Sequence, residues 1–584
     1  MGRVMGYKDT YDGWKHDPEG FWMQAAEAID WDRKPTRALD DSRAPIYQWY
    51  ADGRMNTCHN AVDRHVAAGK GERTAIIYDS PVTDTKRHIS YSELQQATAR
   101  LGGALQEHGV QAGDRVVIYM PMVPEAVIAM LACARIGAVH SVVFGGFAAN
   151  ELAVRIDDAK PKAIIAASCG LEPGRVVHYK PLLDGAIKQA GHKPEFNVIF
   201  QREQAPATLG PRDHDWDDFQ KDAKPAECVP MGGADPLYIL YTSGTTGRSK
   251  GAMLTQANLL SNAETLARVW RFTADDVLLH ALPIFHTHGL FVATNVTLVA
   301  GGAMIFLPKF DLDTILAELP RATAMMGVPT FYTRLLGDDR FTRELVSHVR
   351  LFISGSAPLL EETHRAFEQR TGHRILERYG MTETNMNTSN PYDGERRAGT
   401  VGFPLPGVEL KITDPETGKT LPDGEVGQIE VRGPNVFKGY WQMPEKTAQE
   451  LRADGFFITG DLGRIDADGY VHIVGRNKDL IISGGYNIYP KEIELVLDEQ
   501  PGVLESAVIG VPHPDFGETV LGVLVPKAGA KPDIEAIEEA VRGALARFKH
   551  PRELIVIDEL PRNTMGKVQK SILRDRYQDR FAAV

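Results

Sequence analysis

Apolar and polar residues alternate with two different periods between about residue 89 and residue 400. Short apolar runs, typical of buried strands, are separated by longer segments in which apolar residues recur at helical spacing. Strands and helices of these lengths in alternation predict parallel sheets with helices on both faces. We expect helices at 91–108 and 124–136, and strands at 115–119, 138–144 and 236–241.

The pattern changes twice in the last third of the chain. Residues 401–475 are rich in glycine and β-branched residues and contain frequent turns, which indicates antiparallel strands. After Arg476, helices at 490–500 and 533–547 alternate with strands at 506–511 and 553–556. These elements are enough for a small α+β domain.

Three parts are therefore expected. Residues 1–60 are rich in Trp, Tyr, Asp and Pro without a clear period, and we interpret them as an extension packed on a large domain. The large domain spans 61–476 and the small domain spans 477–584. Inside the large domain, the polar and proline-containing segment 201–233 is expected to be a surface connection.

Composition and charge narrow the class of protein. A chain of 584 residues is too long for one ordinary domain, and its 43% apolar and 24% charged fractions are those of a globular protein. The 65 basic and 77 acidic residues give a net charge of −12, without basic blocks. Nucleic acid is therefore not an expected partner, and an anionic substrate needs local positive charge.

Cysteines and apolar stretches bear on the compartment. The four cysteines are far apart in sequence and show no metal-ligand spacing, so we interpret them as small buried residues in a reducing compartment. The N-terminus has no apolar stretch of signal-peptide length. The most apolar segment, 123–148, is interrupted by Glu125, Arg135 and His140 and is interpreted as a buried helix and strand. A cytoplasmic protein without a membrane partner is expected.

A loop rich in glycine and hydroxyl groups follows the strand expected at 236–241. Its glycines let the backbone turn tightly and expose N–H groups to an anion, while Lys250 adds a point charge suited to phosphate. The loop is not a Walker A motif, because Lys250 precedes Gly251. We interpret it as a cradle for phosphate groups. Its candidate contacts are Thr242, Ser243, Gly244, Thr245, Thr246, Gly247 and Lys250.

The loop sequence YTSGTTGRSKG resembles the phosphate loop of adenylate-forming enzymes, which include acyl-CoA synthetases, luciferases and the adenylation domains of peptide synthetases. Further motifs of that family follow in the same order: ISGSAP, ERYGMTE, ITGDLG, GRNKD and PRNTMGK. The resemblance implies an α/β fold. Its large N-terminal domain has several subdomains, with parallel and mixed sheets flanked by helices and a distorted β-barrel, and a small mobile α+β domain follows. It also implies acyl adenylation and then thioester formation, with ATP, Mg²⁺ and coenzyme A.

By this resemblance, several side chains would hold ATP. Tyr379 would stack on adenine, Thr382 would hydrogen-bond the α-phosphate, and Glu383 would bind Mg²⁺, which prefers carboxylate and phosphate oxygens. Asp461 would accept the ribose hydroxyls, with Arg476 beside it. The remaining nucleotide-binding positions are Ser356, Ala357 and Pro358 in the first motif and Glu377, Arg378, Gly380 and Met381 in the second.

Lys567, in PRNTMGK, matches the catalytic lysine of the family. An ammonium is needed where charge builds between the acyl carboxylate and the α-phosphate. The resemblance also implies a rotation of the small domain about a hinge at Lys478, after which Ser483, Gly484 and Gly485 would line the tunnel for the pantetheine arm of coenzyme A. Acetylation of Lys567 by a lysine acetyltransferase would remove its charge and block adenylation.

From about residue 236 the chain resembles malonyl-CoA synthetase in HALPIFHTHGLF, GVPTFYTRLL, FISGSAPL and ERYGMTETNMNTSNPYDG. A dicarboxylic acid leaves its second carboxylate buried, so a cation is required. Arg334 is the candidate, with a hydrogen bond from Ser356. By the resemblance, His286, Thr287 and Met386 would surround the acyl carbon, and His286 joins Lys567, Thr382 and Glu383 as a catalytic candidate. His286 and His288 lack a third metal ligand nearby in sequence, so zinc is not expected.

The N-terminal part resembles propionyl-CoA and acetyl-CoA synthetases instead, in YDGWKHDPEGFW, NTCHNAVDRHV, VVFGGFAANELAVRIDDAKPK and SCGLEPGRVVHYKP. The chain therefore looks like a recombinant of two related enzymes. By this resemblance Arg175 would contact the nucleotide phosphates of coenzyme A, near Gly145 and Gly146. Three functions stay open: a synthetase for malonate or methylmalonate, a synthetase for propionate or acetate, and a non-catalytic nucleotide-binding protein.

Overall fold

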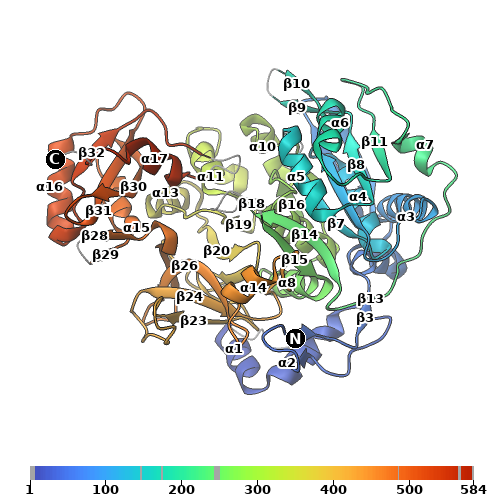
Figure 1. Cartoon of the computed structure of the whole chain (residues 1–584), viewed down its shortest axis with the longest axis horizontal. Helices are drawn as coiled ribbons and strands as arrows, with labels where there is room; N and C mark the ends of the chain where they lie inside the picture. Colours follow the sequence, from blue (N-terminus) through green and yellow to red (C-terminus); the bar gives the residue numbers. More distant parts are fainter. Residues whose placement is uncertain are drawn as a thin grey trace.

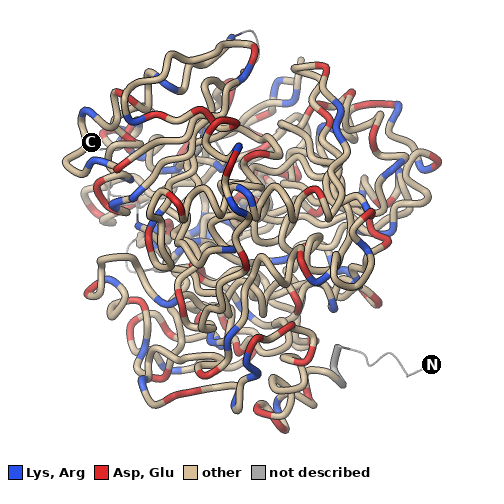
Figure 2. The backbone as a smooth tube through the Cα atoms, turned by 90° about the vertical axis from the view of Figure 1, so that its right-hand side faces the viewer, with Lys and Arg blue, Asp and Glu red and all other residues tan. Residues whose placement is uncertain are grey.

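The computed structural model describes residues 7–144, 148–172, 175–242, 250–483, 486–562 and 567–581. Figure 1 shows two large sheets with helices around them in the N-terminal and central parts of the chain. A smaller sheet lies beneath them, and the C-terminal part lies to one side. Basic and acidic positions are interspersed along the tube in Figure 2, which agrees with the even charge distribution of the sequence.

The first large sheet has eight strands. Its central strands are parallel, and the pairs β14–β15 and β15–β25 are antiparallel. The strands expected at 115–119, 138–144 and 236–241 are confirmed as β6, β7 and β14. In spatial order the sheet contains β12 (Asp213–Asp215), β11 (Phe196–Phe200), β8 (Ala163–Ala167), β6 (Arg115–Met120), β7 (Val139–Phe144), β14 (Pro236–Thr242), β15 (Lys250–Thr255) and β25 (Gly439–Tyr440).

Helices around this sheet follow the expected pattern. The predictions for 91–108 and 124–136 are confirmed by α3 (Tyr91–Glu107) and α4 (Pro124–Arg135). A capping box between Ser90 and Glu93 starts α3, and every residue of α4 is buried. The other helices are α5 (Ala149–Ala159), α6 (Tyr179–Gln189), α7 (Trp216–Gln220) and α8 (Gln256–Val269).

The segment 201–233 is more structured than a surface connection. It contributes the edge strand β12 and the helix α7, and the antiparallel pair of β13 (Met231–Gly232) with β3 (Arg54–Met55) lies at its end. Trp216 and Phe219, three residues apart on α7, are both buried. These two anchors fold the segment locally despite its polar composition.

The second large sheet has nine strands and carries most of the motif segments. Six of its strands, from β20 to β4, are parallel, so the carboxyl ends of β16, β18, β19 and β20 meet along one edge. Its spatial order is β22 (Phe403–Pro404), β21 (Asn385–Ser389), β20 (Leu376–Met381), β19 (Leu351–Ser354), β18 (Ala324–Gly327), β16 (Val277–His280), β17 (Ala303–Phe306), β4 (Thr74–Ser80) and β5 (Thr85–Ser90). Its helices are α9 (Asn295–Ala300), α10 (Leu312–Glu318), α11 (Pro329–Leu336), α12 (Arg343–Val346) and α13 (Glu361–Thr371).

The antiparallel strands expected within 401–475 are confirmed, but they form an open sheet. The expected distorted barrel is wrong for the described residues, because no pairing joins the edge strands β23 and β27. The strand β25, which lies between β24 and β26 in sequence, pairs with β15 of the first sheet instead. The order is β23 (Glu409–Thr413), β24 (Gly427–Arg432), β26 (Phe457–Ile465) and β27 (Val471–Arg476), with α14 (Pro444–Glu450) alongside.

The N-terminal segment packs beside this open sheet through aromatic side chains. Its helices α1 (Tyr7–His16) and α2 (Pro18–Ala25) bring Trp14 and Trp22 into a small cluster with Tyr50. The hydroxyl of Tyr47 donates to the carbonyl oxygen of Asp454 at 3.1 Å. Between this segment and the sheet is a cavity of about 420 Å³. Two short strands, β1 (Leu39–Asp40) and β2 (Gln48–Trp49), pair within the segment.

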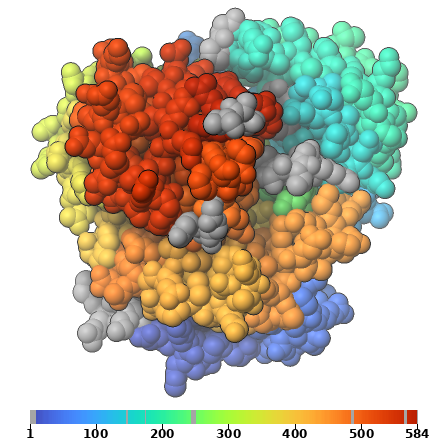
Figure 3. Space-filling model, turned by 60° about the vertical axis from the view of Figure 1, so that its left-hand side comes forward, coloured from blue at the N-terminus to red at the C-terminus, as the bar shows by residue number. Residues whose placement is uncertain are grey.

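The C-terminal part contains the elements expected from its sequence. The helices expected at 490–500 and 533–547 are α15 (Pro490–Asp498) and α16 (Ile534–Ala544), and the strands expected at 506–511 and 553–556 lie in β30 and β32. Figure 3 shows this part, in red, as a rounded body above the orange residues of the open sheet. Its sheet contains β29 (Tyr486–Ile488), β28 (Ile481–Ser483), β31 (Gly517–Pro526), β30 (Val503–His513) and β32 (Glu553–Val556), and α17 (Lys570–Tyr577) follows.

Candidate active site

The carboxyl ends of the parallel strands bring three motif segments together. The segments after β16, β19 and β20 carry His286 to His288, Ser356 and Thr382. The hydroxyl of Thr287 is 3.4 Å from that of Thr382, and Nδ1 of His288 is 3.2 Å from Oγ of Ser356. Side chains about 95 positions apart in sequence are therefore in direct contact.

One end of this site is built around the carboxylate of Asp461. The hydroxyl of Tyr379 donates to its Oδ2 at 2.6 Å, and Nε of Arg476 lies 2.6 Å from its Oδ1. Asp461 and Arg476 are direct cross-strand partners on β26 and β27. Burial and the charge of Asp461 raise the pKa of Tyr379 well above its ordinary value. Tyr379, predicted to stack on adenine, thus meets Asp461 and Arg476, predicted to contact the ribose, at one point.

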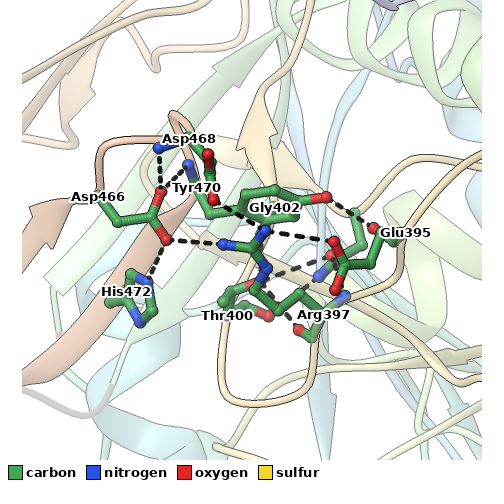
Figure 4. A network of polar contacts seen from close by, with 9 residues as sticks. Glu395, Arg397, Thr400, Gly402, Asp466, Asp468, Tyr470 and His472 are labelled. Carbon is green, nitrogen blue, oxygen red and sulfur yellow. Dashed lines mark hydrogen bonds and ion pairs between the residues drawn. The ribbon is translucent and has the colours of Figure 1, made fainter.

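A network around Arg397 holds the β26–β27 hairpin in place (Figure 4). The Arg397 guanidinium is 3.2 Å from the carboxylate of Asp466 and 3.0 Å from that of Asp468. It also lies 4.1 Å from the ring centre of Tyr470, and His472 pairs with Asp466 at 2.9 Å. The network ties the hairpin that carries Asp461 and Arg476 to the segment after β21.

Glu383 lies in a second cluster of the site, together with the carboxylate of Glu450. The hydroxyl of Tyr440 lies 3.0 Å from Oε1 of Glu383 and 2.5 Å from Oε2 of Glu450, and its single proton is donated to one of these carboxylates at a time. Nζ of Lys250 lies 3.2 Å from the Tyr440 hydroxyl and 3.5 Å from Glu450. Burial raises the pKa of Glu383. Burial also acts to raise the pKa of Glu450, but hydrogen bonds from Lys446 and Tyr440 lower it.

The phosphate loop connects two strands of a hairpin. Thr242 ends β14, Lys250 begins β15, and the two residues are paired. The predicted contacts Ser243, Gly244, Thr245, Thr246 and Gly247 lie outside the described residues. The Tyr440–Glu450 part of the cluster was missed at the sequence level, since no motif or spacing connects it to Lys250.

The guanidinium of Arg378 is buried and has no acidic partner within 4.0 Å among the described residues. The side chain is 4% exposed, and neither Nε nor Nη2 has a hydrogen-bond partner among the described residues. It packs closely against Gly355, where a Cβ would lie 2.4 Å from its Cζ. Burial lowers the pKa of Arg378 to about 9. Such an uncompensated cation is costly unless an anion joins it.

Two histidines share this side of the site. The Nε2 atoms of His286 and His288 are buried without a partner among the described residues. Burial and the charge of Lys567 lower the pKa of His286 to about 3, and burial and the charge of Arg378 lower the pKa of His288. Both rings are therefore neutral at physiological pH. Met386, also expected here, is 1% exposed, and its methyl group lies against Gly380.

Arg334 differs from these groups in its exposure to solvent. It is an exposed residue of α11, and its guanidinium stacks on the ring of Phe310 at 5.8 Å. The expected role of Arg334 as counter-charge for a second carboxylate stays a prediction, and Arg378 is an alternative cation because its side chain is buried. The two arginines were assigned from motif position, which does not specify how each side chain is directed.

Lys567 reaches the site from the C-terminal part. Burial and the charge of Arg476 lower its pKa, and the charges of Asp461, Arg378 and Glu383 also act on it. Lys567 therefore lies between the two ends of the site. Lys478, the expected hinge residue, is an exposed residue of the short helix Asn477–Asp479, and burial of part of its side chain lowers its pKa.

The remaining candidates are dispersed. Glu377 points away from Arg378 toward His364, whose Nδ1 is 3.6 Å from it, and burial raises the pKa of Glu377. Arg175 is exposed and pairs with Glu172 at 2.6 Å. Ser483 ends β28, whereas Gly484, Gly485, Gly145 and Gly146 lie outside the described residues. Ala357 and Pro358 are exposed after β19, while Gly380 and Met381 end β20 beside Thr382.

Family models cover most of the chain. The model for AMP-binding enzymes matches residues 63–441. The model for the acetyl-coenzyme A synthetase N-terminus matches 7–61, and that for the AMP-binding enzyme C-terminal domain matches 492–567. No helix in the described ranges is both long and apolar enough to span a membrane.

Individual proteins match over nearly the whole length. An uncharacterized protein of Pseudomonas aeruginosa is 37% identical over 96% of this chain and 93% of its own. Human acyl-CoA synthetase short-chain family member 3, mitochondrial, is 35% identical over 97% of this chain and 87% of its own. The crystal structure of ATP-bound MatB from Rhodopseudomonas palustris is 51% identical, covers 90% of this chain and 100% of that chain, and superposes with a TM-score of 0.82.

Proposed function

The chain belongs to the AMP-binding enzyme family, and we propose that it is an acyl-CoA synthetase that ligates malonate or methylmalonate to coenzyme A. The reaction has two steps. A carboxylate oxygen of the acid attacks the α-phosphorus of ATP and releases pyrophosphate. The coenzyme A thiolate then attacks the acyl carbon and releases AMP. The proposal rests on one observation above the others, the buried and uncompensated guanidinium of Arg378.

Arg378 is suited to a second carboxylate for electrostatic reasons. A guanidinium that is buried without an acidic partner gains most from an anion placed beside it. Its planar donors match a carboxylate, and Nε and Nη2 are on one edge of the fork, ready for a bidentate contact. A monocarboxylic acid such as propionate offers a methyl group at that position and would leave the charge unpaired.

The nucleotide end would hold ATP. Asp461 would accept the ribose hydroxyls in exchange for its present donors Tyr379 and Arg476, and Lys250 would leave Glu450 for the phosphates. Thr382, next to Thr287, would contact the α-phosphate. The buried carboxylate of Glu383, whose pKa is raised, fits a Mg²⁺ ligand because a cation would compensate its charge. When bound, Mg²⁺ would neutralise charge on the phosphates.

Lys567 would act on the first step. Its ammonium lies among Asp461, Arg378 and Glu383, where it would stabilise charge shared by the acyl carboxylate and the α-phosphate. The second step would follow a rotation about Lys478 that brings Ser483, Gly484 and Gly485 toward the pantetheine arm. In this scheme Arg175 is the contact for the nucleotide phosphates of coenzyme A.

A substrate panel tests the proposed acid. Pyrophosphate release is measured with malonate, methylmalonate, propionate and acetate in the wild type, in R378M and in the matched control R334A. Losing the partner of a buried carboxylate costs about 3–5 kcal/mol, so R378M should lower kcat/KM for malonate by roughly 10²-fold or more. Propionate turnover should change far less, and R334A should keep the preference for malonate.

Two other outcomes of the substrate panel would change the proposal. Equal losses for malonate and propionate in R378M would show that Arg378 serves the reacting groups common to all acids. Propionate far ahead of malonate in the wild type would overturn the proposed substrate. That result would favour the second candidate, a short-chain monocarboxylate synthetase, which the match of residues 7–61 to the acetyl-coenzyme A synthetase N-terminus supports.

A further inference from the structure

Two cysteines that are distant in sequence lie side by side in the fold. Cys58 precedes the helical turn His59–Asp63, and Cys228 lies in the extended segment before β13. Their sulfur atoms and a carboxylate oxygen of Asp63 all lie within 4.8 Å of one another. Cys58 is fully buried, whereas Cys228 is partly exposed. The pair could not be seen in the sequence, where the four cysteines show no common spacing.

The third member of this cluster, Asp63, is already occupied by a cation. Its two oxygens accept hydrogen bonds from Arg135 at 2.8 and 2.9 Å, and Gln95 donates a third at 2.9 Å. The same guanidinium lies 3.9 Å from the sulfur of Cys58. A metal ion bound to both sulfurs would be repelled by Arg135 and would lose Asp63 as a ligand. The cluster is therefore a poor metal site.

The surroundings hold the two sulfurs near each other. The backbone on either side of Cys228 is fixed, because the N–H of Ala226 donates to Ala99 and that of Val229 donates to Arg135, both at 2.8 Å. Arg135 also donates through Nε to the carbonyl of Ala226 at 2.6 Å. The sulfurs lie within 4.8 Å of each other, and we expect side-chain rotation of the cysteines to bring them to the bonding distance of about 2.05 Å.

We propose that Cys58 and Cys228 form a reversible disulfide that responds to peroxide. Both thiols lose hydrogen, one S–S bond forms, and one hydrogen peroxide is reduced to two waters. The peroxide oxygen first adds to the accessible Cys228 as a sulfenic acid with loss of one water. The sulfur of Cys58 then attacks that sulfur and displaces the second water. Arg135 stabilises negative charge on the Cys58 sulfur as it attacks.

The resting state of the pair is the dithiol. The hydrogen bond with Cys58 and burial raise the pKa of Cys228, so this thiol keeps its proton at neutral pH and the pair rests as the dithiol. Reaction with peroxide therefore goes through the small thiolate fraction of Cys228 and is slower than for a free thiolate. Once formed, the bond would join the segment before β13 to the start of the large α/β region. It would thereby close a loop around β6, β7, β8 and β11.

Thiol counting with peptide mapping tests the proposal on the full-length protein. After brief exposure to hydrogen peroxide and denaturation in a thiol-blocking reagent, free thiols should fall from four to two. Mass spectrometry should find a Cys58–Cys228 cross-linked peptide that dithiothreitol removes. The double variant C133S/C169S should oxidise to the same extent. In C228S, no cross-link to Cys58 should form.

Three results would overturn the proposal. The first is that four free thiols remain after peroxide treatment. The second is that peroxide cross-links or overoxidises other cysteines and leaves Cys58 and Cys228 as thiols. The third is that one equivalent of Zn²⁺ protects two thiols of the untreated protein from the blocking reagent, which would show that the pair binds a metal ion. Because mapping is done on the wild type, a variant that fails to fold does not prevent a decision.

Discussion

The two ends of the candidate site, which we propose to hold the nucleotide and the acid, differ in how their charges are paired. At the nucleotide end, Asp461 is bonded by Tyr379 and Arg476, and Glu383 is joined through Tyr440 to Glu450. At the acyl end, Arg378 keeps two guanidinium nitrogens unpartnered among the described residues, as do the Nε2 atoms of His286 and His288. Asp461, Glu383 and Arg378 are all buried, so the difference does not come from the access of water to these three groups.

This difference separates two ways of binding a ligand. A paired group must exchange its protein partner for the ligand, so it contributes modest net affinity. An unpaired buried group costs free energy until the ligand arrives, so it discriminates strongly against a ligand that lacks the complementary group. We therefore expect nucleotide binding to tolerate single substitutions among the partner groups. Selection of the acid should depend on a few side chains, and Arg378 should contribute most.

The largest effect is expected at Lys567, which lies between the two ends. K567A should lower adenylation by about 10²–10³-fold, because a charge that stabilises the transition state is removed. Pyrophosphate release measures this step. Thioester formation from supplied acyl-adenylate and coenzyme A should stay within about tenfold of wild type, since Lys567 is proposed to act only in the first step. Equal loss of both half-reactions would contradict this division.

The pH dependence sharpens the same prediction. The pKa of Lys567 is lowered, so its ammonium loses the proton at a pH below the ordinary lysine value of about 10.4. Hence kcat/KM for adenylation should fall as pH rises through that lowered pKa, and K567R should remove this alkaline limb. Acetylation by a lysine acetyltransferase should act like K567A. If acetylated Lys567 is found in enzyme with full adenylation activity, the predicted effect of acetylation is wrong.

A smaller effect is expected at Glu450. This carboxylate holds Lys250 and Lys446 in the structure and would repel the triphosphate. E450Q should lower the KM for ATP by about two- to fivefold, the size of a partly exposed ion pair, and should leave the choice of acid unchanged. Steady-state kinetics at saturating malonate measure the change. E445Q, which alters an acidic residue at the start of the same helix, is the matched control.

A raised KM for ATP in E450Q would show that Glu450 positions Lys250 productively. The paired cluster would then be part of the nucleotide site as it stands, and not a set of partners to be exchanged. The contrast between the two ends would be weaker as a result.

Much of the fold was predictable because it depends on local patterns. The helix Pro124–Arg135 is buried along its length, and the strand Glu553–Val556 has the bounds expected from its apolar run. The open four-stranded sheet was not predictable as such. Whether it closes depends on where Gly439–Tyr440 pairs, and that contact with β15 links positions nearly 190 residues apart.

The candidate site shows the same limit. Motifs identified Tyr379, Asp461 and Arg476, and the structure brings these three side chains together. Motif position alone did not distinguish the exposed Arg334 from the buried Arg378, because burial depends on neighbours such as Gly355. The recombinant origin stays a prediction, since relatives match both parts of the chain together.

The smallest effect is expected from the Arg397 network, which supports the nucleotide end without touching it. R397A removes contacts to Asp466 and Asp468 at the turn of the hairpin that carries Asp461 and Arg476 (Figure 4). Arg397 is about one-third exposed, so each pair contributes at most about 1 kcal/mol. The KM for ATP should therefore rise no more than about fivefold, with acid preference intact. As a control, R464A, which removes an exposed arginine on β26, should change neither the KM for ATP nor the acid preference. A shift in acid preference in R397A would mean that the two ends are coupled through this hairpin. The proposal that one end exchanges its partners for ATP while the other end selects the acid independently would then be wrong.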